Sequence, residues 1–146
     1  MPYLETGYVL RSGFSRQEPV SDPDALRRTL PAAAEWLAGT RNDDVPPGTL
    51  AGAEGVERLA DQVEAGLPDG IRAHLTYFAI RAGARRLADA SACLSSLGLA
   101  AAASVADTQA RLVGSLQYPI TTGDTRTAAA TLRRLAPTYA ELAKEL

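Results

Sequence analysis

Residues 71–97 read IRAHLTYFAIRAGARRLADASACLSSL and form the longest periodic segment of the chain. Apolar and small residues recur in it at steps of three and four, the spacing that places side chains on one face of an α-helix. The positions on this face are Thr76, Ala79, Ile80, Gly83, Leu87, Ala90, Leu94 and Leu97. At 1.5 Å per residue this helix spans about 40 Å, so we expect it to organise a helical bundle. Its small residues predict that a second backbone approaches it closely.

Four further segments with helical periodicity flank this stretch. They cover residues 21–38, 49–65, 102–118 and 125–146. Between them we expect a polar loop over residues 40–48 and a turn over residues 120–124, because glycine, proline, threonine and aspartate gather there. The chain therefore predicts about five helices.

Capping residues mark the ends of several of these helices. Ser21-Asp22-Pro23-Asp24 supplies an oxygen-bearing cap and a proline that suits a first helical turn. Asp124 or the threonine after it is the predicted cap of the last helix. Gly98 is placed to take the left-handed conformation after the long helix, with Leu99 packing on Leu94 in a Schellman motif. The chain is therefore expected to reverse direction at Gly98.

The composition agrees with a helical fold. The chain has 146 residues, a length typical of one domain, and 46% of them are hydrophobic. Leucine and alanine together number 47, against 10 valines and isoleucines, a bias that favours helix over strand. We predict an all-α bundle of about five helices over residues 21–146, preceded by an extended N-terminal arm over residues 1–20. The arm carries aromatic residues among glycines and is expected to dock on the helices or on a second subunit.

The charge balance excludes one class of partner and divides the chain into two halves. The formal net charge is −2, so the chain lacks the basic surplus that nucleic-acid binding needs, and no nucleic-acid partner is expected. Residues 1–69 carry 6 basic and 12 acidic side chains, whereas residues 70–146 carry 9 and 5. This split predicts either attraction between packed helices of the two halves or a polarised surface that meets a partner.

The sequence also bears on compartment, membrane and metal. Cys93 is the only cysteine, which excludes an internal disulfide and a zinc site built from several cysteines. The N-terminus lacks the pattern of a secretion signal, and the most apolar stretch is too short to cross a bilayer. We therefore predict a cytoplasmic location, no membrane association, no metal and no cofactor.

A second face of the long helix carries the chemically unusual side chains. The only histidine, His74, lies there with Tyr77, Phe78, Arg81 and Arg85 at steps of three and four. An imidazole beside a phenol and guanidinium groups is suited to acid–base work on an anionic substrate. The alternative is a half-packed outer face without chemistry.

Gln109 is the second candidate, because it interrupts an otherwise apolar helical stripe. A buried amide without hydrogen-bond partners costs about 1 to 3 kcal/mol, so we expect Tyr118 or a backbone group to pair with it. A direct ligand contact is the other interpretation. Together these residues define a hypothetical ligand site between helices, lined by His74, Tyr77, Arg81, Gln109, Tyr118 and Tyr139.

One short motif occurs twice. Residues 26–31 read LRRTLP and residues 132–137 read LRRLAP, and Ala-Glu follows each copy. Each proline is expected on the solvent side of its helix, where its ring bends the helix. Two copies do not make a repeat architecture, and chance in an arginine- and alanine-rich chain explains the match.

Two functional hypotheses follow from these features. The first is a non-catalytic helical module that mediates association with another protein or with itself, as a homodimer or larger homo-oligomer. The second is a small-molecule-binding bundle, or a cofactor-free enzyme, that acts on an anionic apolar metabolite at the site lined by the six residues above. Whether the chain is an enzyme is left open, because the familiar catalytic motifs do not occur in it.

Overall fold

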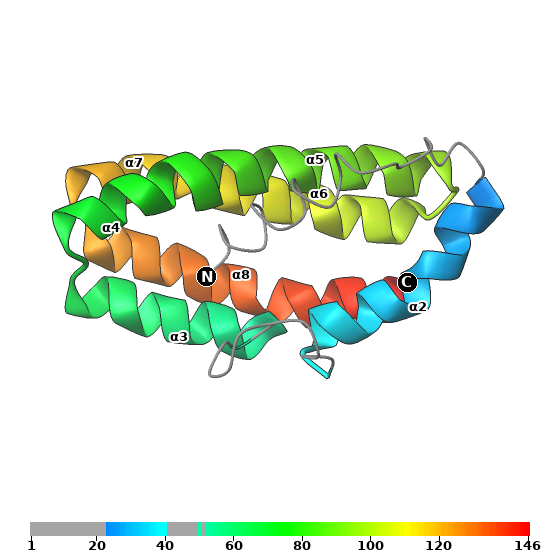
Figure 1. The fold of residues 1–146 in the computed structure, drawn as a ribbon, viewed down its shortest axis with the longest axis horizontal. Helices are drawn as coiled ribbons and strands as arrows, with labels where there is room; N and C mark the ends of the chain where they lie inside the picture. The colour runs from blue at the N-terminus through cyan, green and yellow to red at the C-terminus, as the bar shows by residue number, and fades with distance from the viewer. Residues whose placement is uncertain (1–22, 41–49, 51) are drawn as a thin grey trace, which may run out of the picture.

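The computed structural model describes residues 23–40, 50 and 52–146, and every secondary-structure element in these ranges is helical (Figure 1). The fold is therefore all-α, as predicted. The elements are α2 (Pro23–Ala38), α3 (Gly52–Ala65), α4 (Asp69–His74), η1 (Leu75–Ile80), α5 (Arg81–Ser96), α6 (Ala100–Ser115), α7 (Gln117–Thr122) and α8 (Thr125–Glu145). The predicted arm of residues 1–20, the cap at Ser21 and nearly all of the loop over residues 40–48 lie outside the described residues.

The predicted long helix is confirmed, with one unpredicted feature. α4, η1 and α5 follow one another without a break, and η1 is a π-helical segment. The Arg81 N–H donates to the carbonyl of Thr76, five residues earlier rather than four. The Thr76 hydroxyl donates to the carbonyl of Arg72 at 3.0 Å. The spacing of apolar residues does not distinguish this wider turn from an ordinary α-helical turn.

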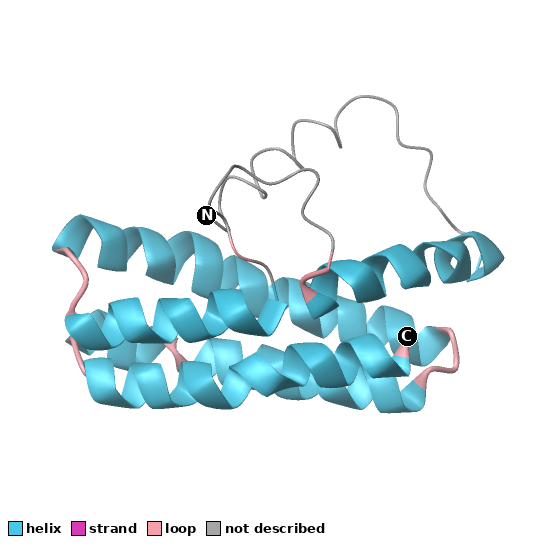
Figure 2. Ribbon diagram, turned by 90° about the horizontal axis from the view of Figure 1, so that it is seen from below, coloured by secondary structure: helices cyan, strands magenta, loops and turns pink. Residues whose placement is uncertain are grey.

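The helices form two packed groups that share a long axis. α5 packs on α6, whereas α2 and α3 both pack on α8. α2 and α3 lie end to end along α8 in Figure 1, and α6 joins the two groups through its contact with α8. Figure 2 shows from a second direction that the long helices run roughly along one axis. The bundle is thus built around the pair α6 and α8.

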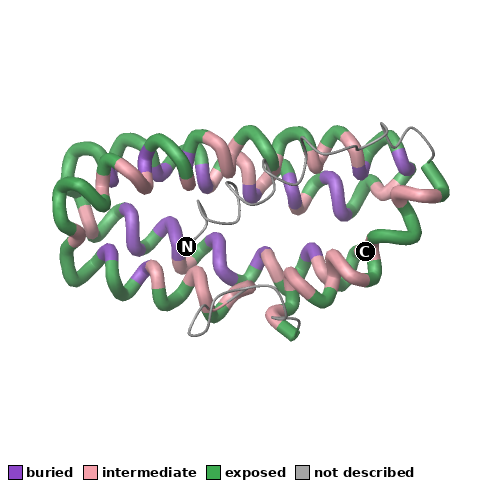
Figure 3. The backbone as a smooth tube through the Cα atoms, viewed as in Figure 1, coloured by how far each residue is buried: buried purple, intermediate pink, exposed green. Residues whose placement is uncertain are grey.

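The core consists of two apolar clusters that follow each other along this axis (Figure 3). The first core cluster contains Ala60, Val63, Ile80, Val113, Leu116, Ile120, Ala128, Ala129, Leu132 and Leu135. The second core cluster contains Leu94, Ala102, Ala103, Ala106 and Leu142. Of the face predicted for the long helix, Ile80 lies in the first core cluster and Leu94 in the second, whereas Ile120 of the first cluster comes from the segment predicted as a turn.

The small residues predicted to allow a close approach of backbones face α6, where the glycines meet side chains at ordinary van der Waals distance. A Cβ atom added at Gly83 would lie 3.7 Å from a methyl group of Val113, and one added at Gly114 would lie 3.8 Å from the Cβ of Ala84. The Schellman motif after α5 is confirmed. Gly98 has φ +79°, and the Leu99 N–H donates to the carbonyl of Leu94 at 2.9 Å.

A close approach of backbones that was not predicted joins α2 to α3. Gly52 has φ +64°, and a Cβ atom added there would lie 2.7 Å from the carbonyl oxygen of Leu37. The end of α2 therefore abuts the beginning of α3.

The predicted turn over residues 120–124 is wrong for its first three residues. α7 continues to Thr122, and Pro119 lies in its first turn, where a missing N–H leaves no hydrogen bond unmade. Ile120 is buried in the first core cluster, and this burial favours the helical turn over an open one.

The predicted cap of α8 is confirmed at Asp124. Its carboxylate accepts the N–H of Thr127 at 3.1 Å and the hydroxyl of the same residue at 2.7 Å. These hydrogen bonds hold the pKa of Asp124 below its ordinary value.

Candidate functional site

One end of the bundle exposes large apolar side chains. Among the described residues, those with substantial exposure are Ile71 (45%), Tyr77 (61%), Phe78 (50%) and Tyr118 (78%). They belong to α4, η1 and α7, which contact one another at one end of the molecule (Figure 1). We call these four residues the aromatic end. Exposed apolar groups gathered in one region typically mark a binding surface.

The π-helical segment forms part of this surface. Thr76 and Ile80 are buried, whereas Tyr77 and Phe78 between them are exposed. π-Helical turns are rare, and they occur frequently at functional sites. The π-helical backbone and the two exposed aromatic rings therefore occur in the same segment, Leu75–Ile80.

Three arginines, Arg81, Arg85 and Arg86, follow the exposed rings along α5, and Asp89 is the first acidic residue after them. The Arg81 guanidinium carbon lies 5.9 Å from the centroid of the Tyr77 ring, within the range of a cation–π contact. Arg81 and Arg85 form no ion pair with any described residue.

His74 lies on the same helix and contacts an aromatic ring. The ring centroids of His74 and Phe78 are 4.6 Å apart, with the planes tilted by 39°. Four of the five residues predicted on this face thus form two pairwise contacts, His74 with Phe78 and Tyr77 with Arg81. Tyr118 lies on α7, at the same end of the bundle.

The other two predicted site residues lie elsewhere. Tyr139 is half-buried and packs on the first core cluster. Gln109 is fully buried, because the stripe of α6 that carries it faces α8. The structure thus gathers four of the six predicted residues at one end and leaves Gln109 inside the core.

The hydrogen-bond partner predicted for Gln109 is wrong. Its Nε2 donates to the Thr138 hydroxyl of α8 at 3.1 Å, and that hydroxyl in turn donates to the carbonyl of Leu135. Of the two predicted partners, Tyr118 follows the end of α6 and is exposed, and no backbone group among the described residues pairs with the amide. The Gln109 Oε1 atom is buried without a hydrogen-bond partner among the described residues. The geometry assigns this amide to a contact between helices.

A small cavity lies near the aromatic end. Its volume is about 10 Å³, and it is lined by Val63, Leu67, Arg72, Pro119, Ile120 and Thr125. This space suits about one water molecule. A ligand at this end of the bundle would therefore bind on the surface rather than in this cavity.

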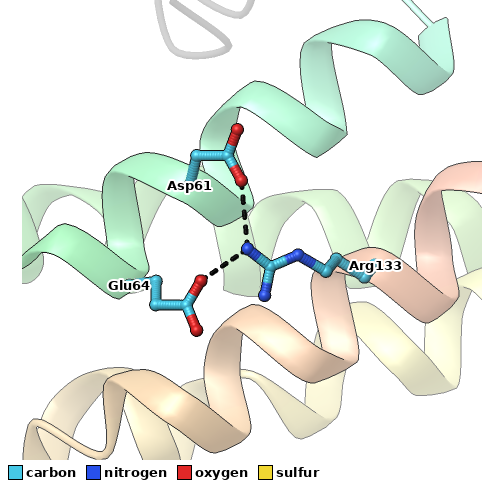
Figure 4. Close-up of polar contacts among 3 residues, drawn as sticks. All are labelled: Asp61, Glu64 and Arg133. Atoms are coloured by element: carbon cyan, nitrogen blue, oxygen red, sulfur yellow. Dashed lines mark hydrogen bonds and ion pairs between the residues drawn. The ribbon is translucent and has the colours of Figure 1, made fainter.

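The acidic face of α3 forms an ion-pair cluster with α8 (Figure 4). One guanidinium nitrogen of Arg133 lies 3.0 Å from the Asp61 carboxylate and 2.6 Å from that of Glu64. Hydrogen bonds to these carboxylates raise the pKa of Arg133. The cluster joins acids of the N-terminal half to a base of the C-terminal half.

Two further findings concern the described residues as a set. No group of three or more histidine, cysteine or acidic side chains lies close enough within them to hold a metal ion. No helix among them has the length and hydropathy to cross a membrane.

Ile71 is the residue of the aromatic end that the sequence reasoning missed. It precedes His74 by three positions and therefore lies on the same side of the helix. This spacing was the available signal, but an isoleucine in an amphipathic segment is more often a core residue.

Comparison with known families identifies most of this bundle. The model of the YobF C-terminal domain family matches residues 46–146, which include α3 to α8. The chain belongs to the YobF C-terminal domain family. The YobF-family segment includes the whole aromatic end, whereas α2 lies outside the matched residues. No curated protein and no solved structure matches the chain significantly.

Proposed function

We propose that this protein is a non-catalytic association module whose aromatic end binds an acidic, partly apolar segment of another protein. The single observation that carries the proposal is the gathering of four exposed large apolar side chains on α4, η1 and α7. Covering such side chains on binding removes apolar surface from water. Tyrosine, phenylalanine and arginine are also the residue types enriched at protein interfaces.

The charge of the surface supports an acidic partner. Arg81 and Arg85 follow the exposed rings within two helical turns, and they have no carboxylate partner among the described residues. A partner with carboxylates beside its apolar anchors would pair with these guanidinium groups. A basic partner would meet like charge.

Titration of the full chain with two amphipathic helical peptides tests this proposal. Both peptides carry the same leucines and phenylalanines, but glutamate fills the polar face of one and lysine that of the other. We expect saturable binding of the acidic peptide only, measured by calorimetry. The double variant Tyr77→Ser/Arg81→Ser should lose at least about tenfold in affinity, a loss of about 1.4 kcal/mol.

A matched control uses an arginine on another element. Arg134 is exposed on α8, and Arg134→Ser should leave the affinity unchanged. Equal binding of both peptides, or an unchanged affinity in the double variant, contradicts the proposal. Loss of a homodimer in Tyr77→Ser/Tyr118→Ser would instead identify a second copy as the occupant of the aromatic end.

A small anionic apolar ligand is the second candidate, bound on the same face or turned over there without a cofactor. It is favoured by the placement of Arg81 against Tyr77 on the face that also carries His74. A ligand present at 100 times its dissociation constant stabilises a protein by about 2.7 kcal/mol, which a thermal-shift screen detects. If every thermal shift is retained in both His74→Ala and Arg81→Ala, the proposal of a ligand on this face is wrong.

We place either activity in the cytoplasm. The argument is the single cysteine of the sequence, Cys93, since secreted domains of modest size commonly rely on paired cysteines. Fractionation of the native cells, with detection of the full chain, tests this location.

A further inference from the structure

The π-helical segment η1 changes which residues of the long helix face the core. Inward positions of an α-helix recur at steps of three, four and seven, because one turn takes about 3.6 residues. Ile80 is buried in the first core cluster. Counted back from it, these steps would turn Tyr77, Thr76 and Ala73 inward. Only Thr76 is buried, whereas Tyr77 and Ala73 are exposed. The pattern of an uninterrupted α-helix therefore does not continue through η1.

The inward positions that precede the buried Thr76 are displaced by one residue. Leu75 packs on the first core cluster and lies five residues before Ile80. Arg72 is half-buried, lines the small cavity beside α7, and lies eight residues before Ile80. Steps of five and eight in place of four and seven correspond to one extra residue in the helix. The π-helical turn thus acts as a one-residue insertion.

This insertion decides whether Tyr77 or Leu75 faces the core. In an uninterrupted α-helix of the same sequence, Tyr77 would lie on the inner face with Ile80, and Leu75 would lie on the outer face. The structure shows the opposite arrangement, because Leu75 packs on the core and Tyr77 is exposed. A chain without Tyr77 would place Leu75 four residues before Ile80 and would bury it without a π-helical turn. Tyr77 is therefore the residue of this turn that the core does not need.

The outward position of Tyr77 brings its ring against a cation. The Arg81 guanidinium carbon lies 5.9 Å from the ring centroid, and Arg81 forms no ion pair with any described residue. A guanidinium group that stacks on a ring keeps its N–H donors for a carboxylate. The two side chains therefore present an apolar ring and a cationic donor side by side.

We propose that Tyr77 is the principal contact residue of the aromatic end, and that the π-helical turn is an insertion that holds its ring outward beside Arg81. An apolar anchor of the acidic partner packs on the ring, and a carboxylate of the partner pairs with Arg81. The identity of this partner rests on the proposed function. The placement of Tyr77 by the insertion does not, because it follows from burial along the helix.

Two deletions in the full chain test this placement. A variant that lacks Tyr77 should fold with a Tm within about 4 °C of the wild type, because Leu75 and Arg72 then lie at ordinary α-helical steps from Ile80. The matched control lacks Ala88, which is also exposed on the long helix but lies in α5, where no π-helical turn absorbs the deletion. The control should lose at least about 10 °C in Tm or fail to fold, because part of the inner face rotates by about 100°. Circular dichroism measures the helix content and the Tm of each variant.

Calorimetric titration with the acidic amphipathic peptide tests the role of the ring. The variant that lacks Tyr77 and the variant Tyr77→Ala should each lose at least about tenfold in affinity. Tyr77→Phe should keep the affinity within about threefold, because a phenylalanine ring also stacks against Arg81.

The outcomes separate this inference from the proposed function. A loss of Tm without Tyr77 as large as that without Ala88 would overturn the inference, since the core would then need Tyr77. Unchanged affinity without Tyr77, in a series whose wild type binds the peptide, would overturn the role of the ring. A wild type that binds no acidic peptide overturns the proposed function and with it the partner, and the two Tm values then decide the placement of Tyr77 alone.

Discussion

α2 and α8 carry nearly the same motif and are held in the bundle very differently. LRRTLP in α2 and LRRLAP in α8 both lie within a helix, and Pro31 and Pro137 are both exposed, as the pattern predicts. Yet eight residues of α8 are buried and none of α2 is. α8 contacts α2, α3, α6 and α7, whereas α2 contacts chiefly α8 and α3. The periodicity of apolar residues thus predicts which face of a helix turns inward. The number of neighbouring helices determines how deeply that face is buried.

The equivalent arginines of the two motifs show the same contrast. Arg27 reaches a backbone carbonyl at the end of α5, whereas Arg133 reaches two carboxylates on the surface of α3. Each links its helix to another. Only the first of these links holds an element that lacks buried side chains.

The largest expected effect comes from removing one leucine from each helix. Leu135→Ala in α8 should lower the free energy of unfolding by about 2 to 5 kcal/mol, because it leaves a cavity in the first core cluster. Leu30→Ala in α2 should lower it by about 1 kcal/mol, because that side chain is only half-buried. Urea denaturation measures both values. Equal losses of unfolding free energy in the two variants would show that α2 is held as firmly as α8.

A buried polar group on α8 gives the next effect. Thr138→Val removes the acceptor of the Gln109 amide and should cost about 1 to 3 kcal/mol. The double variant Gln109→Leu/Thr138→Val should be more stable than Thr138→Val alone, since no amide is then left unpaired. A double-mutant cycle in urea checks this. Simple additivity of the two single changes would show that the hydrogen bond carries no coupling.

Gly52, at the beginning of α3 against the end of α2, gives a smaller and more local effect. Gly52→Ala brings a methyl group against the backbone of Leu37, whereas Gly66→Ala also adds a side chain at positive φ but meets no atom within 4 Å. Gly52→Ala should therefore cost about 1 kcal/mol more than Gly66→Ala. Hydrogen exchange should show the extra loss in α2 and not in α8. Equal exchange in both helices would mean that α2 is coupled to the core more tightly than its burial indicates.

The smallest effect concerns pH and the beginning of α8. The lowered pKa of Asp124 means that the folded state favours its carboxylate, so this stabilisation is present above the ordinary carboxyl pKa and is lost as pH falls through the lowered value. Asp124→Asn keeps an acceptor for the Thr127 N–H but cannot titrate. The difference in Tm between wild type and Asp124→Asn should therefore shrink between neutral pH and about pH 3. A difference independent of pH would contradict the role of the charge.

Much of the fold follows from local patterns in the sequence. The helical periodicity of residues 125–146, the cap at Asp124 and the reversal at Gly98 depend on neighbours within one or two turns, and the structure confirms all three. The helical turn at Ile120 was missed because its stability comes from burial against distant residues rather than from local propensity.

The candidate site was harder to predict than the fold. The periodicity predicts the two contacts that the structure shows on this face, His74 with Phe78 and Tyr77 with Arg81. It does not show that Tyr118 comes to the same end, or that Gln109 pairs with Thr138, 29 residues away. The π-helical turn also escapes prediction, because Thr76 and Ile80 have the same spacing in both kinds of helix.

The hydrogen bond between Gln109 and Thr138 has a consequence for how α6 and α8 are positioned along each other. It lies between the two core clusters, on helices whose facing residues are largely alanine and leucine. Such aliphatic surfaces tolerate sliding, since a shift of one turn, about 5.4 Å, replaces one methyl group with another. The Gln109 amide does not tolerate such a shift, because it would then face aliphatic side chains that cannot form a hydrogen bond with it. Like a buried asparagine in a coiled coil, Gln109 therefore sets one register between α6 and α8.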